Sequence, residues 1–446
     1  MTMNDAVGAS PFVALLLGAA AIGVLGPRVR ADPRTWASLA AVISVSAFAV
    51  ASLAGSGPDS LGGILRRDTA SAFVSALVCL VASVLFLFQG RDGSPRVIAA
   101  SLLASSGAVL AASAADIVAL VIAIGVVGLA AVAPDGPDER RRELVRAALP
   151  AGLVALGAAL AFADVGSTRV GALGGVSSPL GLIGIGLIVA GLATCATLVP
   201  FDGLAPRVSM RTSTLTATFV GLIGRVAAFA ALLRIAGAIS ATGALIPDWR
   251  ASVAIIATIT VVVASVASLT ETSLRRILAS LATAQVGYAA TALTAGVAAG
   301  PAVAFTLAIT AALTVGGVAL MAALGDAQLH DLRGLARRRP YLVAGLALLL
   351  LGSAGVPPTA GFIARVYVFE IALGAQLAWL VILGSLASVV TTVAALRVAF
   401  ACLGEGDARP ACSRANLIAV AVAASAVLLI GVFPAPLLDA VANVSF

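Results

Sequence analysis

Four arginines lie inside long apolar stretches of the sequence: Arg225, Arg234, Arg365 and Arg397. A charge in a membrane helix costs at least about 2.5–3.5 kcal/mol unless it faces water or a polar interior, so such residues often mark ion paths. Arg225 lies near the middle of its run, and Glu370 follows Arg365 by five positions. Arg234 and Arg397 lie nearer helix ends, where a long side chain reaches the interface without any function. Arg225 and Arg365 are therefore the first candidates for a proton path.

Other polar side chains add little further chemistry. Glu370 is either a proton carrier or only the counterion of an arginine, and Asp116 opens an apolar run as an interfacial anchor. The four cysteines are scattered and His330 is the single histidine, so neither a disulfide framework nor a metal or haem site is indicated. The sequence contains no phosphate-binding loop, nucleophile elbow or zinc signature, so we expect no catalytic centre and no cofactor in this chain.

The composition indicates which elements carry these residues. Apolar residues make up 61% of the 446 residues and charged residues only 11%, and the mean hydropathy is +1.12. A soluble domain has about 25% charged residues, so this chain has too few to cover a water-facing surface. The net charge of +7 comes from too few charges to build a nucleic-acid-binding face. We predict a protein embedded in the lipid bilayer.

Long apolar runs predict the spans. A bilayer core about 30 Å thick needs roughly 17–25 apolar residues in a helix, and these runs lack the alternation of barrel strands. About fourteen runs are present, near residues 10–26, 35–54, 69–88, 97–114, 116–133, 145–162, 179–199, 213–239, 250–270, 274–297, 300–324, 341–374, 376–402 and 415–440. The fifth is the shortest, and the twelfth is too long for one straight span.

The arginines also predict the orientation, because cytoplasmic loops hold the excess of basic residues. With the first connection in the cytoplasm, 19 arginines fall on the cytoplasmic side and 4 on the other. Both termini are then predicted on the non-cytoplasmic side of a bacterial inner membrane. The N-terminus has Asp5 and no basic run before its first apolar stretch, which is typical of a retained helix rather than a cleaved signal peptide.

Proline and glycine break two of the runs. The seventh ends in Leu198-Val199-Pro200-Phe201-Asp202, and the twelfth contains Gly355-Val356-Pro357-Pro358-Thr359. Paired breaks at matching places indicate inverted repeats, although proline and glycine also kink ordinary spans. We expect an all-α polytopic membrane protein with about 14 transmembrane helices and two inverted five-helix repeats with broken helices 7 and 12. The parts are residues 1–96 with three helices, the repeats 97–239 and 250–402, and the C-terminal helix in 415–446.

Several stretches, in order along the chain, carry a likeness to a known family. They are Thr197–Phe201 with Ala205-Pro206, Arg225–Arg234, Ser273–Tyr288, Asp331–Phe369 and the tail Leu429–Asp439. Together they resemble the antiporter-like subunit N of NADH-quinone oxidoreductase, the proton-pumping respiratory complex I. The likeness covers roughly residues 100 to 440. The fourteen helices, outward termini and paired repeats of that family agree with the expectations from the residues alone.

The resemblance implies a polar chain at mid-depth of the membrane, along which buried lysines and a glutamate move protons by changing charge. This sequence departs from that pattern: Gly125 replaces a glutamate, Cys195 a lysine, Arg225 and Arg365 two further lysines, and Asp202 and Gln285 two histidines. A buried lysine can release its proton, whereas arginine stays protonated. Because the glutamate expected at Gly125 and the lysine expected at Cys195 are both absent, neither is left as an unpaired buried charge. This is the pattern expected when a site is lost but the fold is kept.

Two hypotheses follow for a membrane-arm subunit of a complex I-type enzyme. In the first it takes part in proton translocation through Arg225, Arg365, Glu370, Gln285 and Asp202. In the second it is a structural, non-pumping subunit. A third possibility is a related complex: a membrane-bound hydrogenase, formate hydrogenlyase or multisubunit cation/proton antiporter. The expected partners are other membrane-arm subunits and the lipid bilayer, not nucleic acid. NADH, FMN, iron–sulfur clusters and quinone are expected in the partner subunits.

Overall fold

The computed structural model describes residues 3–29, 32–88, 94–132, 137–201, 214–242, 246–406 and 414–444. Every regular element within these ranges is a helix. The chain forms two compact units, which divide between Trp249 and Arg250.

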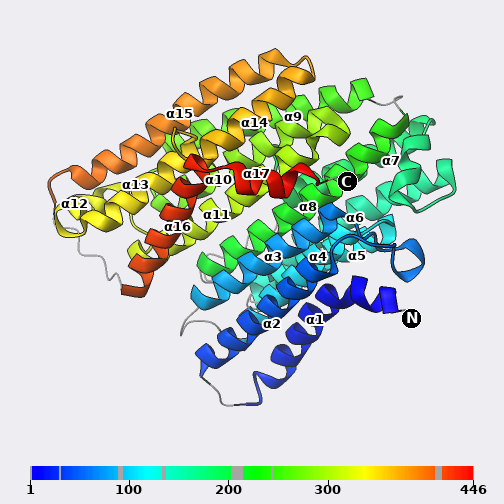
Figure 1. Cartoon of the computed structure of the whole chain (residues 1–446), viewed down its shortest axis with the longest axis horizontal. Coiled ribbons are helices and arrows are strands. Elements are labelled where there is room, and N and C mark those ends of the chain that lie inside the picture. The colour runs from blue at the N-terminus through cyan, green and yellow to red at the C-terminus, as the bar shows by residue number, and fades with distance from the viewer. Residues whose placement is uncertain are drawn as a thin grey trace. The chain divides into compact units, whose positions relative to one another are not determined.

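The first unit consists of helices (Figure 1). Its elements are α1 (Met3–Leu25), α2 (Pro33–Ala54), the short 3-10 helix η1 (Leu61–Gly63), α3 (Thr69–Phe88), α4 (Pro95–Ser113), α5 (Ile117–Val132), α6 (Pro137–Val165), η2 (Val170–Gly175), α7 (Pro179–Ala196) and α8 (Thr214–Thr242). Proline at the start of α2, α4 and α7 suits the first helical turn, because the missing N–H would have no partner there.

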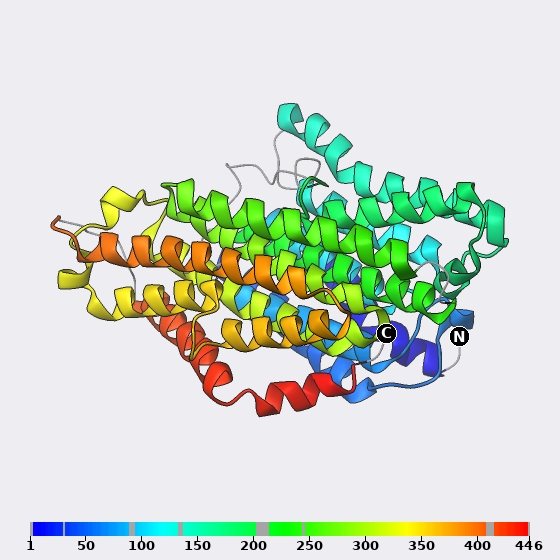
Figure 2. The same cartoon turned by 90° about the horizontal axis from the view of Figure 1, so that it is seen from above.

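The second unit contains two closely spaced pairs of helices. Its elements are α9 (Ile246–Thr270), whose first residues precede the boundary, α10 (Leu274–Ala292), η4 (Leu293–Ala299), α11 (Gly300–Leu324), η5 (Leu329–Leu332), α12 (Leu335–Arg338), α13 (Pro340–Ala354), α14 (Ala360–Gly374), α15 (Ala378–Leu403), α16 (Arg414–Val432) and α17 (Ala435–Ala442). The pairs are α13 with α14, which includes the break, and α16 with α17, which is bent by 77° and drawn in red in Figure 2.

The structure confirms a polytopic, all-helical membrane protein. Eleven helices of the described residues are long and apolar enough to span a membrane, and the bent pair α16–α17 makes up to twelve. The expected run 116–133 falls on α5, and the expected run 341–374 falls on α13 and α14. Each of these helices is shorter than the 18 residues required of a candidate span. The last expected run, 415–440, is not one straight helix, because it bends after Val432.

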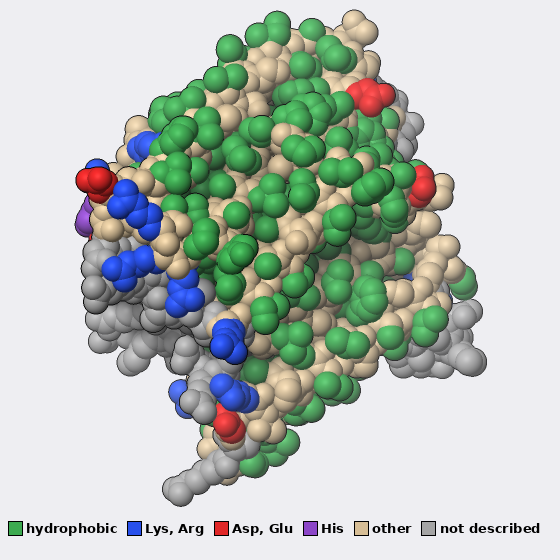
Figure 3. All heavy atoms as spheres, turned by 60° about the vertical axis from the view of Figure 1, so that its left-hand side comes forward, with side chains coloured by type: hydrophobic (Ala, Val, Ile, Leu, Met, Phe, Trp, Pro, Cys, Tyr) green, Lys and Arg blue, Asp and Glu red, His purple; other side chains and the backbone are tan. Residues whose placement is uncertain are grey.

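Apolar side chains dominate the surface shown in Figure 3. Many large ones point outward, including Ile382 at 62% and Leu386 at 60% exposure on α15. Arginine side chains, drawn in blue, gather toward the edge that carries the purple His330, near α12 with Arg337 and Arg338 in its last turn. Acidic side chains, drawn in red, also lie at the opposite edge. An apolar surface with charges kept to its edges suits a bilayer bounded by water.

Glycine lets α6 and α7 approach each other closely. A Cβ atom added at Gly184 would lie 2.7 Å from the carbonyl oxygen of Gly157, and one added at Gly191 would lie 2.7 Å from that of Pro150. Small residues of this kind are typical of helix contacts in membranes, where close van der Waals packing replaces the hydrophobic effect.

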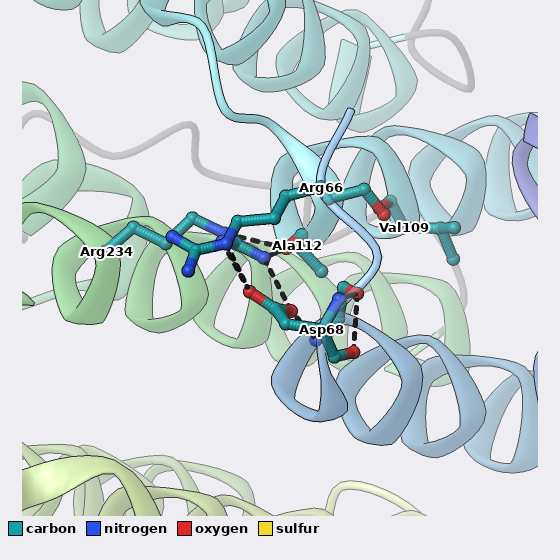
Figure 4. A network of polar contacts seen from close by, with 7 residues as sticks. Arg66, Asp68, Val109, Ala112 and Arg234 are labelled. Carbon is teal, nitrogen blue, oxygen red and sulfur yellow. Dashed lines mark hydrogen bonds and ion pairs between the residues drawn. The ribbon is translucent and has the colours of Figure 1, made fainter. Parts of the chain in front are cut away.

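A buried ion pair ties three helices of the first unit together (Figure 4). The two terminal nitrogens of Arg234 on α8 donate to the carboxylate oxygens of Asp68, at 2.9 and 3.0 Å. Its Nε and Nη2 also donate to the carbonyl oxygen of Ala112 on α4, at 3.0 and 2.6 Å. Arg234 is only 5% exposed, so the expectation that this arginine simply reaches water is wrong.

Asp68 also fixes the start of α3. Its carboxylate accepts from the backbone N–H of Ser71 at 2.8 Å, and its own N–H donates to the Ser71 hydroxyl at 3.1 Å. Arg66 approaches the same carboxylate at 3.4 Å. Burial would raise the pKa of Asp68, but the attraction of Arg234 and hydrogen bonds from Arg234 and Ser71 outweigh it, so the pKa lies below its usual value.

The contact between α6 and α7 predicts opposite effects at two neighbouring glycines. Gly184→Ala should lower the melting temperature of the detergent-solubilised chain, because overpacking a close contact costs about 1–3 kcal/mol. The control is Gly186→Ala, where an added Cβ meets nothing within 4 Å; there the better helix propensity should stabilise by up to about 1 kcal/mol. Equal melting shifts for the two variants would contradict the close contact.

The ion pair predicts a large loss of stability when one partner is removed. Asp68→Asn leaves the Arg234 charge buried without a carboxylate and should cost about 3–5 kcal/mol of unfolding free energy. The control is Arg276→Gln, which breaks the exposed Arg276–Glu271 pair and should cost less than about 1 kcal/mol. Unfolding in denaturing detergent measures both.

The lowered pKa of Asp68 predicts a matching dependence on pH. The ionised carboxylate stabilises the folded state above the usual value of 3.8, and this contribution is lost as the pH falls through the lower folded-state pKa. The melting temperature of the unaltered chain should therefore fall in that acidic range. Asp68→Asn should remove this part of the pH dependence, and an unchanged acid profile would contradict it.

Candidate functional site

The break between α13 and α14 is a defined helix cap. Gly355 ends α13 in the left-handed conformation, with φ 69° and ψ 43°. The backbone N–H of Val356 donates to the Leu351 carbonyl at 3.0 Å, and that of Gly355 to the Gly352 carbonyl at 3.1 Å. This cap satisfies part of the last turn, but the following carbonyls still need donors, and lipid supplies none.

Arg365 on α14 supplies those donors. Its Nη2 donates to the carbonyl oxygen of Ser353 at 2.8 Å, and its Nη1 donates to the Ala354 carbonyl and to the Ser388 hydroxyl on α15. The side chain is 2% exposed. A Cβ at residue 355 would lie 2.6 Å from Cδ of Arg365, so Gly355 is required both for its positive φ and for this close approach.

Helix α10 adds two side chains to the same place. Gln285 is 2% exposed, and its Nε2 donates to the Ser353 carbonyl at 2.8 Å. Tyr288 donates to the carbonyl of Gly384 on α15 at 2.8 Å, and its ring centroid lies 4.4 Å from the Arg365 guanidinium carbon. We call Gln285, Tyr288, Ser353, Arg365 and Ser388 the Arg365 cluster.

Electrostatics explain how a charge is tolerated in this cluster. Arg365 lies at the C-terminal end of α13, where the helix dipole is negative, and over the negative face of an aromatic ring. Glu370 is exposed, and no ion pair joins it to Arg365 in the part of the chain that the structure describes. Our counterion interpretation of Glu370 is therefore wrong for Arg365.

The first unit shows a similar arrangement at the end of α7. Thr197 caps that helix in the left-handed conformation, with φ 58° and ψ 37°, and the N–H of Leu198 donates to the Ala193 carbonyl at 2.9 Å. Arg225 on α8 donates from Nε to the Thr197 hydroxyl at 3.0 Å. Both helix ends thus have the same cap, with an arginine beside it. Asp202, a few residues further on, lies outside the described residues.

Gly125 and Cys195, where the resemblance to subunit N implies a glutamate and a lysine, lie on α5 and α7. A Cβ atom added at Gly125 would meet only the Ala151 methyl group, at 3.9 Å, and Cys195 is half-buried near Gly224. Neither residue carries a charge. In the second unit, Arg397 donates from Nη2 to the Glu271 carbonyl, away from the Arg365 cluster.

Sequence reasoning found two members of the Arg365 cluster and missed three. Arg365 and Gln285 were both candidates, and they meet at one carbonyl oxygen. Tyr288 and Ser353 both stand in stretches that carry the resemblance, whereas nothing in the sequence marks the Ser388 hydroxyl. Within the described residues, no group of three His, Cys, Asp or Glu side chains could hold a metal ion.

Comparison with known proteins gives one consistent result. The profile of the NADH:quinone oxidoreductase/Mrp antiporter transmembrane family matches residues 144–391. NADH-quinone oxidoreductase subunit N of Rhodospirillum rubrum is 30% identical over 357 residues, which are 75% of this chain and 73% of that protein.

Two solved structures share the fold. A chain of respiratory complex I from Thermus thermophilus with bound aureothin superposes with a TM-score of 0.83 at 26% identity, covering 96% of this chain and 98% of that one. A chain of the membrane-bound sulfane sulfur reductase, an archaeal respiratory complex, gives 0.85 at 21% identity, with 98% and 96% covered. The chain therefore belongs to the NADH:quinone oxidoreductase/Mrp antiporter transmembrane family, within its subunit N group.

Proposed function

We propose that this chain is a membrane-arm, antiporter-like subunit of a NADH-quinone oxidoreductase-type respiratory complex and takes part in proton translocation. The observation that carries the proposal is the Arg365 cluster, a buried positive charge held at a helix break within this family's fold. Electrons pass through other subunits, which hold NADH, FMN, iron–sulfur clusters and quinone. The neighbouring chains are other membrane-arm subunits in a bacterial inner membrane.

The chemistry of arginine defines the role of the cluster. Arg365 keeps its proton, so it acts as a fixed charge that orients water and sets the local potential for protons passing nearby. Gln285 and the Ser388 hydroxyl extend the hydrogen-bonding groups around it. On α11, Thr306, Thr310 and Thr314 form a buried column of hydroxyls on one helix face, whose oxygen lone pairs accept hydrogen bonds from water.

The second candidate function is a structural, non-pumping subunit. Gly125 and Cys195 favour it, because the glutamate and lysine of related subunits are both absent at these positions. Removing both together leaves no unpaired charge. The remaining path candidates in the first unit are Arg225 and Asp202, and Glu370 in the second is exposed. A chain of the membrane-bound sulfane sulfur reductase has the same fold. A related respiratory complex is therefore the alternative assembly to which this chain could belong.

We further propose fourteen spans arranged as two inverted five-helix repeats. Counting α5 and the pair α13–α14 as spans, with α16–α17 as one, adds three to the eleven long helices. The matching caps at Thr197 and Gly355 support repeats over 97–239 and 250–402, flanked by 1–96 and 415–446. In this arrangement both termini lie on the non-cytoplasmic side.

The proton-to-electron ratio of the reconstituted complex distinguishes the two functions. If the chain takes part in translocation, Arg365→Ala and Arg225→Ala should lower this ratio, because each removes a fixed charge beside the path. Arg365→Lys should restore part of it, because it returns a cationic group to this position, although lysine, unlike arginine, can release its proton when buried. Arg397→Ala is the matched control, a partly buried arginine outside the cluster.

Stability must be followed in the same experiment. Arg365→Ala removes one donor from each of the Ser353 and Ala354 carbonyls, which keep the hydrogen bonds from Gln285 and Ser388. The expected cost is that of the lost charge-assisted hydrogen bonds, about 1.5–3 kcal/mol each. Native electrophoresis of the complex shows whether assembly is intact. An unchanged proton-to-electron ratio in an intact complex, for both alanine variants, would exclude translocation and leave the structural role.

A further inference from the structure

A lateral groove opens beside Arg365 between α14 and α15. It encloses about 460 Å³, within the range of small-molecule sites, which is about 300–1,000 Å³. We call it the Arg365 groove, lined chiefly by Arg365, Val366, Ser385, Ser388, Val389 and Val393. Arg365 is its most deeply buried polar member, at 2% exposure.

The rim of the groove is apolar and faces outward. Val366 is 46% exposed, Val389 62% and Val393 48%. Valine side chains exposed on spanning helices contact acyl chains in a bilayer. Ser388 lies in the middle part of α15, whose 26 residues exceed the thickness of the bilayer core. The groove therefore opens to lipid near mid-depth of the membrane.

Within the described part of the chain, the hydrogen-bond and ring partners of the cation at the base of the groove are all neutral. Arg365 contacts two carbonyl groups, one hydroxyl and an aromatic ring. Its Nε is buried and has no hydrogen-bond partner. The dipoles of neutral partners offset only part of the free-energy cost of desolvating a buried cation. An anionic partner would offset more of this cost. A carboxylate suits this position, since guanidinium and carboxylate match in geometry and charge.

We propose that the Arg365 groove binds a long-chain fatty acid, with its carboxylate on Arg365 and its chain along the valines of α14 and α15. A headgroup fixed at the interface does not reach mid-depth, whereas a fatty acid enters lipid as the uncharged acid. On binding, the O–H bond of the acid breaks, the proton leaves to bulk water at the membrane surface as hydronium, and the carboxylate remains beside the guanidinium. The hydroxyl of Ser385 donates to the same anion, whereas that of Ser388 already donates to the Ala354 carbonyl. This inference does not depend on the proposed function.

Photolabelling of the assembled complex in native membrane vesicles tests the proposal. A diazirine derivative of palmitic acid should label peptides within residues 360–403. Val389→Trp fills the groove and should reduce this labelling at least about tenfold, the factor expected for a loss of about 1.4 kcal/mol. Leu386→Trp is the matched control, because Leu386 is equally exposed on α15, at 60% against 62%, but does not line the groove.

Competition identifies the group that is recognised. Unlabelled palmitate should displace the probe, whereas methyl palmitate, which lacks the charge, should not. Arg365→Gln should weaken labelling as strongly as Val389→Trp, with assembly checked by native electrophoresis. Equal labelling of the two tryptophan variants would overturn the proposal, as would displacement by methyl palmitate. Displacement by phosphatidylglycerol instead would assign the groove to a phospholipid, and absence of label in the assembled complex would show that a neighbouring subunit covers it.

Discussion

The packing around the helix break in the second unit depends on one constraint: the last carbonyls of α13 need hydrogen-bond donors inside the membrane. Water cannot satisfy the last carbonyls of α13, so the protein must supply donors from its own side chains. Arg365 does so through two nitrogens that reach three oxygens. Its position then constrains its neighbours: residue 355 must be glycine to leave room, Tyr288 lies against the guanidinium, and Ser388 places α15 beside α14.

Arginine at position 365 provides better hydrogen-bond geometry than lysine would, but it lacks the ability of a buried lysine to release its proton. The planar guanidinium reaches two carbonyls and a hydroxyl at once, which a single ammonium does with poorer geometry. It also stays charged where a buried lysine can lose its proton. A residue that completes the helix end so well is therefore a poor proton carrier, and in the role that we propose it acts only through its electric field and the water that it orients. Arg225 beside the cap of α7 is subject to the same limit.

The sequence was most informative where chemistry is local. Composition predicts the membrane class, and proline with glycine predicts the break at Gly355. Partners that lie far apart in the chain were not predictable: Asp68 and Arg234 are separated by 166 residues. Their meeting depends on the rotation and register of α3, α4 and α8, and helices that are apolar on all sides do not encode their rotation in a simple pattern. Glu370 shows the same limit, because five positions along a helix place it on a different face from Arg365.

Three arginines inside the apolar helices share one property: Arg225, Arg234 and Arg365 each contact a helix end or a helix start. Gly125 and Cys195, where the resemblance to subunit N implies a glutamate and a lysine, carry no charge. A buried charge persists when its removal would leave partners unsatisfied, and it is easily lost when its partner is lost with it. The charges that remain therefore serve the fold first, and any part they play in proton movement is built on the same contacts that hold the broken helices.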